Sequence, residues 1–342
     1  MKLLKLVPDT TNIHFLKWRV PFYIVSILLI VASWGLVATQ GLNLGVDFVG
    51  GQMIRATFTQ DAEAPVAELR REIGALGYGE PVIQRFGQPN EVSIRMRLPE
   101  ANGPEAKGPE AKGSEGGQAS EAKDLADRMT VAITGDMQAN HPGVRIDGVD
   151  SVSGKVSGEL FETGMYALLG AMVMISIYIW IRFEWQFGVG AMFALLHDVS
   201  LTLGMFAVTG MEFDLNIVAA ILAIIGYSLN DTIVVYDRIR ENLKKYRKMP
   251  MTELLDLSVN ETLSRTVVTS LTTLAVLLVL MFVGPAMTFG FAAAIAFGIF
   301  VGTYSSIYMA APILIWLRVK SDSFVPRESE ADKQERLARG EV

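Results

Sequence analysis

The sequence contains no cysteine among its 342 residues. Disulfide bonds, thiol catalysis and thiolate metal sites are therefore excluded. Histidine is also scarce, and His14, His141 and His197 lie too far apart in the sequence to form a local metal-binding motif. The sequence thus indicates neither a metal site nor another cofactor, and any chemistry must rest on carboxylates, arginine and hydroxyl groups.

Charged residues are also few. Only 19% of the residues are charged, whereas 51% are hydrophobic, a balance that favours a membrane protein over a soluble one. The 30 basic residues are outnumbered by 36 acidic ones, for a net charge of -6. The chain therefore lacks the basic excess that is typical of proteins that bind nucleic acid, and nucleic acid is excluded as a partner.

Six apolar stretches approach or exceed the roughly 20 residues that a helix needs to cross a membrane. We place them at 20–39, 163–181, 187–209, 215–236, 262–283 and 289–317. The first follows several basic residues and has no convincing small-residue cleavage site after it, so it is expected to stay as an uncleaved anchor.

Lysine and arginine fall on one side of these spans. They occur in the N-terminal segment 1–19, at Arg182 between the second and third spans, and in the loop 237–261 after the fourth. The turns at 210–214 and 284–288 have none. The positive-inside rule therefore predicts that both termini are cytoplasmic.

This topology leaves residues 41–162 on the outer side as a folded domain. Alternating and helical apolar patterns predict strands at 52–58, 81–86, 91–98 and 144–149, with helices at 66–76 and 123–139. The order β-α-β-β-α-β is typical of a ferredoxin-like α+β domain. Residues 101–120 repeat GPEAK and are rich in glycine, which predicts a flexible surface insert. The predicted fold class is thus six transmembrane helices with one periplasmic α+β domain between the first two.

Two cytoplasmic segments are less regular. Residues 250–263 place leucines and a valine among acids and hydroxyls, which favours a short interfacial helix, with a plain loop as the alternative. The tail 318–342 is charged and is expected to be disordered.

Ionisable side chains inside a span cost about 2.5 to 3.5 kcal/mol each and call for a reason. Asp231 lies in the fourth span, in GYSLNDTIVV at 226–235. Tyr227 and Ser228 share its helical face, and Asn230 adjoins it. This face is expected to point into the bundle.

Arg265 opens the fifth span. Hydroxyl residues recur beside it at helical spacing: Thr262, Thr266, Thr269, Ser270 and Thr273. Asp231 and Arg265 lie toward the cytoplasmic ends of neighbouring antiparallel spans, so we predict that they form an ion pair. The alternatives are a pair that only fixes helix register, or an arginine that reaches the membrane surface alone.

His197 and Asp198 are adjacent in the middle of the third span. Consecutive helical residues point about 100° apart, so the two are expected to face different neighbours. One of them is a candidate member of a proton relay. The alternative is that serine and threonine partners satisfy both and that neither conducts protons.

Small residues recur every four positions in the sixth span. They are Ala294, Gly298, Gly302 and Ser306. Such a stripe allows close helix packing, and ordinary packing is the favoured interpretation, with a sliding surface as the alternative.

The sequence GVDFVGG at 45–51 follows the first span. Gly45, Gly50 and Gly51 permit unusual backbone angles, and Asp47 can cap a turn, so we predict a rigid joint between the domain and the membrane. The segment lacks the lysine and the serine or threonine of a phosphate-binding loop, and no ATPase motif is present.

Three motifs together resemble one known family. GVDFVGG at 45–51, GYSLNDTIVVYDRIREN at 226–242 and NETLSRTVVTSLTT at 260–273 are similar to the SecF branch of the SecD/SecF family of protein-export membrane proteins. The resemblance implies a non-enzymatic subunit of the bacterial inner membrane that works with SecD and the SecYEG channel. It implies use of the proton-motive force, with protons as the coupling ion, to pull preproteins out on the periplasmic side. The family's essential acid falls on Asp231 and its essential arginine on Arg265.

The resemblance has two gaps. The family's Gly-Pro pair before the second span is missing from DSVSGKVSGEL at 150–160, and the insert at 101–120 is not part of the family pattern. Two other functions stay open. One is a proton-coupled exporter of small molecules or lipids from the same resistance-nodulation-division superfamily, for which the outer domain looks small. The other is a non-transporting scaffold of the channel.

Overall fold

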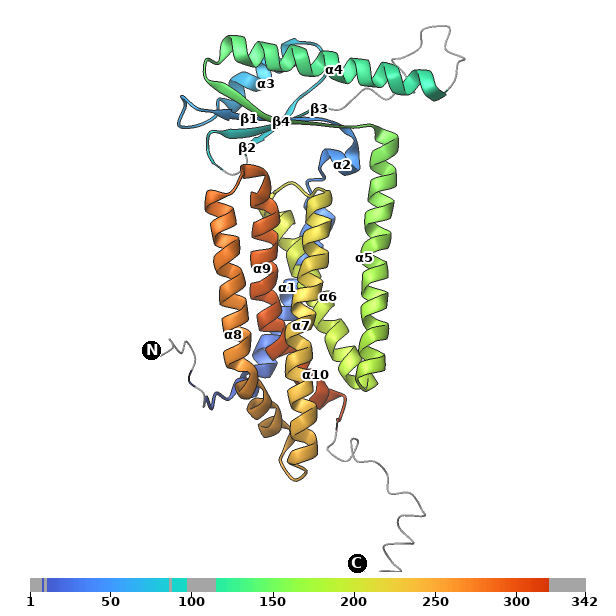
Figure 1. Cartoon of the computed structure of the whole chain (residues 1–342), viewed down its shortest axis with the longest axis vertical. Helices are drawn as coiled ribbons and strands as arrows, with labels where there is room; N and C mark the ends of the chain where they lie inside the picture. The colour runs from blue at the N-terminus through green and yellow to red at the C-terminus, as the bar shows by residue number, and fades with distance from the viewer. Residues whose placement is uncertain (1–7, 9–10, 86–87, 97–114, 320–342) are drawn as a thin grey trace, which may run out of the picture.

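The computed structural model describes residues 8, 11–85, 88–96 and 115–319. They form a bundle of long helices with a small β-sheet domain at one end (Figure 1). Within these residues, six helical segments are long and apolar enough to cross a membrane. They are α1 (Arg19–Gln40), α5 (Gly154–Arg182), α6 (Trp185–Thr209), α7 (Leu215–Lys245), α8 (Met251–Val283) and a sixth that begins with α9 (Phe289–Ser305). The predicted fold class is confirmed: six apolar helices, with one α+β domain between the first two.

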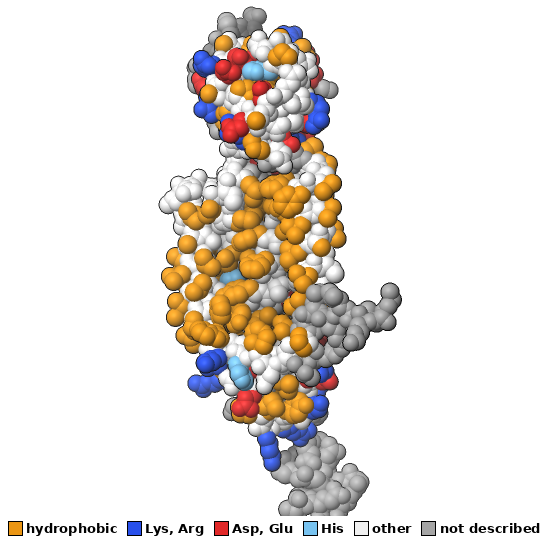
Figure 2. Space-filling model, turned by 90° about the vertical axis from the view of Figure 1, so that its left-hand side faces the viewer, with side chains coloured by type: hydrophobic (Ala, Val, Ile, Leu, Met, Phe, Trp, Pro, Cys, Tyr) orange, Lys and Arg blue, Asp and Glu red, His pale blue; other side chains and the backbone are white. Residues whose placement is uncertain are grey.

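The bundle has a buried centre and an apolar outside. Helices α6, α7 and α9 form the centre, and α1, α5 and α8 lie around them. Leu28 on α1, Trp180 on α5 and Val279 on α8 are all more than half exposed. Figure 2 shows hydrophobic side chains over the middle of the bundle and charged side chains beyond both of its ends. Such a surface suits contact with lipid or with helices of a membrane partner.

The segment after the fourth span differs from the prediction. Instead of a loop at 237–261 with a separate interfacial helix, α7 continues to Lys245 and α8 begins at Met251. Helix α8 runs unbroken because it contains no glycine or proline. Leu255 and Val259 are buried in the core of the bundle. The prediction of a separate interfacial helix at 250–263 is therefore wrong. Neighbouring helices bury the apolar face that the prediction placed at the membrane surface.

The sixth span is not one regular helix. After α9 comes a π-helical segment, Ser306–Ala310, and then α10 (Ala311–Trp316). Pro312 in the first turn of α10 has no N–H to donate, which accounts for the irregular hydrogen bonding before it. Two carbonyls of the π segment accept bonds from tyrosine hydroxyls, Met309 from Tyr23 at 2.9 Å and Ala310 from Tyr236 at 3.0 Å. The break is thus satisfied inside the protein, as backbone at membrane depth requires.

The sheet domain follows the predicted order of strands and helices. Its elements are β1 (Gly51–Phe58), α3 (Val66–Ala75), β2 (Val82–Arg85), β3 (Glu91–Met96), α4 (Glu115–Asn140) and β4 (Val144–Val152). All neighbouring strands are antiparallel, in the order β2-β3-β1-β4. The strand order and the β-α-β-β-α-β sequence of elements together give a ferredoxin-like domain.

The central strand β1 has two different faces. Ile54, Ala56 and Phe58 are buried in the core that α3 and α4 cover. Arg55 and Thr57 point to the opposite face because successive side chains of a strand alternate. That second face lies toward the end of the bundle (Figure 1). The domain therefore turns a polar surface to the membrane helices.

Two predicted boundaries shift. Of the insert at 101–120, residues 101–114 lie outside the described residues, whereas 115–120 belong to α4 and are helical rather than flexible. Helix α5 begins at Gly154 rather than at 163, because Ser153 caps it by accepting a hydrogen bond from the backbone N–H of Val156. Residues 320–342 of the predicted disordered tail lie outside the described residues.

Candidate functional site

Two carboxyl groups are buried in the middle of the bundle. Asp198 on α6 is 0% exposed and Asp231 on α7 is 7% exposed. A carboxylate at membrane depth is costly unless protein groups bind it. The partners of these two side chains therefore define the candidate site.

Asp231 is bound by two hydroxyl groups. Thr266 on α8 donates a hydrogen bond from Oγ1 to Oδ1 at 2.6 Å. Ser306, the first residue of the π segment, donates from Oγ to Oδ2 at 2.9 Å. A hydroxyl can donate to an ionised carboxylate and can also accept from a protonated one. This environment therefore accommodates Asp231 with or without its proton.

Asp198 is bound by three side chains. Nδ1 of His197 lies 2.8 Å from its Oδ1. Ser305 Oγ donates to Oδ2 at 2.8 Å, and Ser228 Oγ donates to the same oxygen. Asp198 is thus fully enclosed by polar groups of α6, α7 and α9.

The two carboxyl groups are linked through neighbouring residues. Ser305 and Ser306 are consecutive, and they bind different carboxylates. Ser228 lies one turn before Asp231 on the same face of α7. A Cβ added at Gly302 would lie 3.0 Å from Cβ of Ser228, so this glycine allows α9 and α7 to approach closely. We call the whole set the buried polar cluster: His197, Asp198, Ser228, Asp231, Thr266, Ser305 and Ser306.

Arg265 does not form the predicted contact with Asp231. Its side chain is exposed on α8, and its guanidinium has no salt bridge or hydrogen bond with a described residue. Its charge is still near enough to attract the carboxylate. Successive helical residues point about 100° apart, so the turn of α8 that aims Thr266 at Asp231 aims Arg265 away. The predicted ion pair is therefore wrong for this arrangement of the helices.

Three other predicted residues lie beside the cluster rather than in it. Tyr227 donates a hydrogen bond to Ser270 Oγ at 3.3 Å, and that oxygen lies 2.8 Å from Thr303 Oγ1. Asn230 and Thr269 are exposed, and the Thr269 hydroxyl bonds to the carbonyl of Arg265 on its own helix. Neighbouring residues of α7 thus contact two separate sets of hydroxyl side chains: Asp231 contacts Thr266 and Ser306, whereas Tyr227 contacts Ser270.

The expectation for His197 and Asp198 is only partly right. Their side chains contact each other rather than facing apart. The ring of His197 also lies against Tyr304, with centroids 5.8 Å apart, whereas Asp198 turns to the serines. The contact forms because the carboxylate can reach sideways to the ring nitrogen of the preceding residue.

The serines of the sixth span form contacts with both buried carboxyl groups that the sequence did not reveal. Ser305 was not predicted, and Ser306 was singled out only as a small residue. Its stripe does pack closely, because a Cβ added at Gly298 would overlap the side chain of Ile224 on α7. The usable signal was the run of hydroxyl residues in the middle of a largely apolar span: Thr303, Tyr304, Ser305 and Ser306.

The predicted joint contains a short helix, α2 (Val46–Val49). Gly50 and Gly51 follow it with φ of 73° and 121°, in the region that favours glycine. Asp47 accepts a hydrogen bond at Oδ2 from the backbone N–H of Leu215 at 2.9 Å. Asp47 therefore caps the start of α7 rather than a turn of its own segment.

A second contact fixes the joint to the turn between α6 and α7. The N–H of Gly45 donates to the carbonyl of Phe213 at 2.9 Å, and Leu44 forms a parallel bridge with the same residue. A Cβ added at Gly45 would lie 3.0 Å from Oε1 of Glu212, so glycine permits this approach. The domain is thus attached to three helices of the bundle: α1, α5 and α7.

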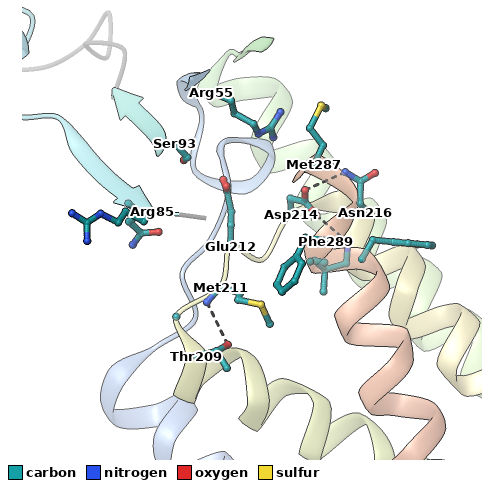
Figure 3. Close-up of a pocket in the computed structure, with 15 residues that line it drawn as sticks. Arg55, Arg85, Ser93, Thr209, Met211, Glu212, Asp214, Asn216, Met287 and Phe289 are labelled. Atoms are coloured by element: carbon teal, nitrogen blue, oxygen red, sulfur yellow. Dashed lines mark hydrogen bonds between the residues drawn. The ribbon is translucent and has the colours of Figure 1, made fainter. Parts of the chain in front are cut away.

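A cavity of about 210 Å³ lies between the sheet and the bundle. Figure 3 shows Glu212 rising from the α6–α7 turn into the space beside Arg55, Arg85 and Ser93. Oε1 of Glu212 is buried and has no hydrogen-bond partner within the described residues. Burial raises the pKa of Glu212, although Arg95 and Arg55 oppose the shift through their charges.

We expect Glu212 to make the stability of the chain depend on pH. Its folded pKa exceeds the ordinary value of 4.5, so stability falls as pH rises from that value through the raised pKa, and it is greater at lower pH. Thermal unfolding in lipid nanodiscs between about pH 5 and 8 tests this. Glu212→Gln should flatten the acid-side gain, whereas Glu68→Gln, at an exposed position, should not. Equal pH profiles for wild type and Glu212→Gln would contradict the assignment.

No three His, Asp or Glu side chains among the described residues cluster closely enough to hold a metal ion. Comparison with known families gives two matches. The family described as protein export membrane protein SecD/SecF, C-terminal, matches residues 133–320, and the SecD/SecF GG motif matches residues 35–62. Both descriptions are of a protein-export family rather than of an enzyme.

Similar proteins cover most of the chain. Protein translocase subunit SecF of Rhodobacter capsulatus is 42% identical over 92% of this chain and 91% of its own length. SecF of Rickettsia bellii is 39% identical over 91% of this chain and 95% of its own length. The crystal structure of SecDF from Thermus thermophilus, titled a translocon-associated membrane protein, matches with a TM-score of 0.75 and 32% identity over 92% of this chain. The match spans 40% of that longer chain. By these family matches and relatives, the chain belongs to the SecF branch of the SecD/SecF family of protein-export membrane proteins.

Proposed function

We propose that this translocase subunit couples proton movement across the bacterial inner membrane to the export of preproteins. Asp231 is the proton carrier, because arginine keeps its proton at any relevant pH. The observation that carries the proposal is the binding of a buried Asp231 by hydroxyl groups alone, from α8 and the π segment. Such partners hold the carboxyl group in place without fixing its charge.

Arg265 supplies the opposing charge. In the arrangement described here it attracts Asp231 without touching it. A rotation of α8 that turns Arg265 inward would replace the Thr266 bond by an ion pair and favour release of the proton. One charge that crosses the membrane supplies about 2.3 kcal/mol per 100 mV, enough to choose between two helix packings of similar energy.

A partner subunit fits the surface of α7 and α8. Asn230, Arg265 and Thr269 are exposed at membrane depth, where lipid disfavours polar groups. The similar SecDF chain contains more than this chain does, since the match spans 40% of it. We assign this surface to contact with SecD, and the complex to the SecYEG channel and its preprotein substrate.

The charge distribution supports one orientation. The end of the bundle far from the sheet domain carries Arg182, Arg238, Arg240, Lys244 and Lys245. The positive-inside rule places this end, and with it both termini, in the cytoplasm. The sheet domain is then periplasmic, where it can act on an emerging polypeptide.

Export driven by an imposed proton gradient tests the proposal through Arg265. In proteoliposomes with SecD and the channel, Arg265→Gln should reduce the gradient-dependent part of preprotein export at least about tenfold. Arg265→Lys should keep the charge but lose activity, because an ammonium group lacks the planar fork that matches a carboxylate.

Lys244→Gln is the matched control, since it removes one exposed positive charge at the end of α7. It should leave the gradient dependence unchanged. If Arg265→Gln exports as wild type does, in a complex of normal composition, the chain is a scaffold and the proton-coupling proposal is wrong.

A further inference from the structure

We infer that His197 and Asp198 form a second proton-binding site, coupled to Asp231 through the paired hydroxyls of Ser305 and Ser306. The inference deepens the proposed function and rests on Asp231 as its proton carrier. The ligand is a proton, taken up by the imidazole ring while the Asp198 carboxylate balances the charge.

The imidazole has one nitrogen free to receive the proton. Nδ1 of His197 faces Oδ1 of Asp198 at 2.8 Å. A carboxylate only accepts, so Nδ1 carries the hydrogen when Asp198 is ionised, and Nε2 is then an unprotonated acceptor. Nε2 is buried and has no hydrogen-bond partner within the described residues, on a side chain 1% exposed. A buried nitrogen without a partner is an exception that needs a reason, and proton uptake supplies one.

The charge of a protonated His197 is balanced inside the site. Imidazolium beside ionised Asp198 is an ion pair with no net charge, and Ser228 and Ser305 bind the other carboxylate oxygen. Asp198 thus makes proton uptake possible where an isolated imidazolium would be too costly.

Few other titratable groups face this site. Between residues 20 and 40, α1 has no charged side chain. In the middle of the neighbouring elements, the titratable side chains are Tyr23 on α1, Tyr166 and Tyr178 on α5, Tyr227, Asp231 and Tyr236 on α7, Tyr304 on α9 and Tyr308 in the π segment. The charged residues of α5 at 155–162 and 182, and those of α7 at 237–245, lie toward the ends of these helices. Tyr166 and Tyr178 are exposed on the outside of the bundle, and the Tyr23 hydroxyl is bound to a backbone carbonyl. Asp231 is therefore the one carboxyl group on a neighbouring helix that the cluster connects to the histidine.

The connection runs through two serines that each have two acceptors. Ser305 Oγ lies 2.8 Å from Asp198 Oδ2 and 3.1 Å from the carbonyl of Gly302. Ser306 Oγ lies 2.9 Å from Asp231 Oδ2 and 3.0 Å from the carbonyl of Thr303. A hydroxyl group has one proton and cannot donate it fully to two acceptors. Each serine therefore donates mainly either to the carboxylate or to the backbone carbonyl.

Protonation changes that choice. A protonated carboxyl group attracts the serine proton less, so the hydroxyl turns to its backbone carbonyl. The two serines are consecutive and stand at the start of the π segment, a kind of helix irregularity that often marks functional sites. A shift of one serine therefore moves the other, and the proton state of Asp231 reaches the His197 site.

The test is nitrogen NMR of the full chain, labelled with ¹⁵N-histidine and assembled with SecD in lipid nanodiscs. The chain has three histidines, and the signal that His197→Gln removes identifies His197. The chemical shifts of its two ring nitrogens, recorded from about pH 8 to pH 5, report whether the ring is neutral or doubly protonated, and the inference requires the doubly protonated form to be observed in that range. Asp231→Asn should lower the ratio of protonated to neutral ring at least about threefold at fixed pH, because it removes a nearby negative charge.

Two comparisons separate coupling from a general disturbance. Asp237→Asn on the same helix breaks an exposed ion pair with Arg182 and should leave the ratio unchanged. In a chain that carries both Ser305→Ala and Ser306→Ala, Asp231→Asn should change the ratio less, because only the direct attraction between the charges remains. An equal change in both backgrounds would contradict coupling through the serines. The wild-type titration itself needs no substitution, so a variant that fails to fold does not remove the test.

A His197 ring that stays neutral throughout the pH range would overturn the inference, and so would a ratio that ignores Asp231→Asn. Export is not part of this measurement, so the two proposals can fail separately. If Asp231→Asn loses export but the His197 ring stays neutral, only the second proton-binding site is refuted. Normal export by Asp231→Asn with a responsive His197 refutes only the proposed function.

Discussion

Replacing Asp231 with asparagine is expected to reduce gradient-driven export to the level seen without a gradient, a loss of at least about tenfold in its proton-dependent part. Asparagine has nearly the same shape, and its carbonyl oxygen can still accept the bond from Thr266 that now spans 2.6 Å. It cannot take up or release a proton, and its amide meets Ser306 as a donor. The change therefore removes the proton carrier and leaves the packing of α7 and α8 in place.

Preprotein release from proteoliposomes, with and without an imposed proton gradient, measures this effect. Asp237→Asn is the control, because it lies on the same helix and loses an exposed ion pair of 2.9 Å with Arg182. Pairs of this kind contribute little, and export should be unaffected. Gradient-dependent export by Asp231→Asn at the wild-type rate would eliminate this carboxyl group as the carrier.

Gly204→Leu is expected to lower the free energy of unfolding by about 3 kcal/mol or more, the upper range for overpacking. Gly204 on α6 faces Ser33 on α1, and a Cβ at this position would lie 3.1 Å from the Ser33 backbone Cα. Backbone cannot yield as a flexible side chain can. Small residues at such contacts let membrane helices approach closely, so a leucine here must separate α1 from α6.

Thermal unfolding in nanodiscs measures the loss, and Gly35→Leu is the matched control. Gly35 lies on α1, just beyond Ser33, and a Cβ there would meet nothing within 4 Å. The same substitution at this open position should change stability little. If both variants unfold at the same temperature, the close contact of α1 and α6 does not stabilise the bundle.

Most of the architecture could be predicted because its signals are long and periodic. Spans of about 20 apolar residues and strands that alternate across β1 and β3 leave few other folds open. The start of α8 could not be placed, because apolar residues such as Leu255 give one pattern whether membrane or neighbouring helices bury them. The π segment escaped for a related reason, since Pro312 indicates a break without indicating its form.

The residues of the candidate site could be predicted where burying the side chain in a membrane costs much free energy, and could not be predicted where burial costs little. Asp231 and Asp198 stand out because charge at membrane depth requires compensation. Ser305 does not stand out, and Thr266 does so only as one of several hydroxyl residues beside Arg265, since a hydroxyl can turn to its own backbone and needs no partner on another helix. The predicted contact of Arg265 with Asp231 was wrong for a geometric reason. The sequence of a span shows which residues share a helical face, but it does not show how the helix is rotated about its axis relative to its neighbours.

Residues 44–47 attach the sheet domain to the α6–α7 turn, at the N-terminal end of α7. The helix is a rod of 31 residues, about 46 Å long at 1.5 Å per residue. Asp231 lies close to the midpoint of that rod. If α7 tilts as a rigid body about this point, its end at the sheet domain and its far end move in opposite directions.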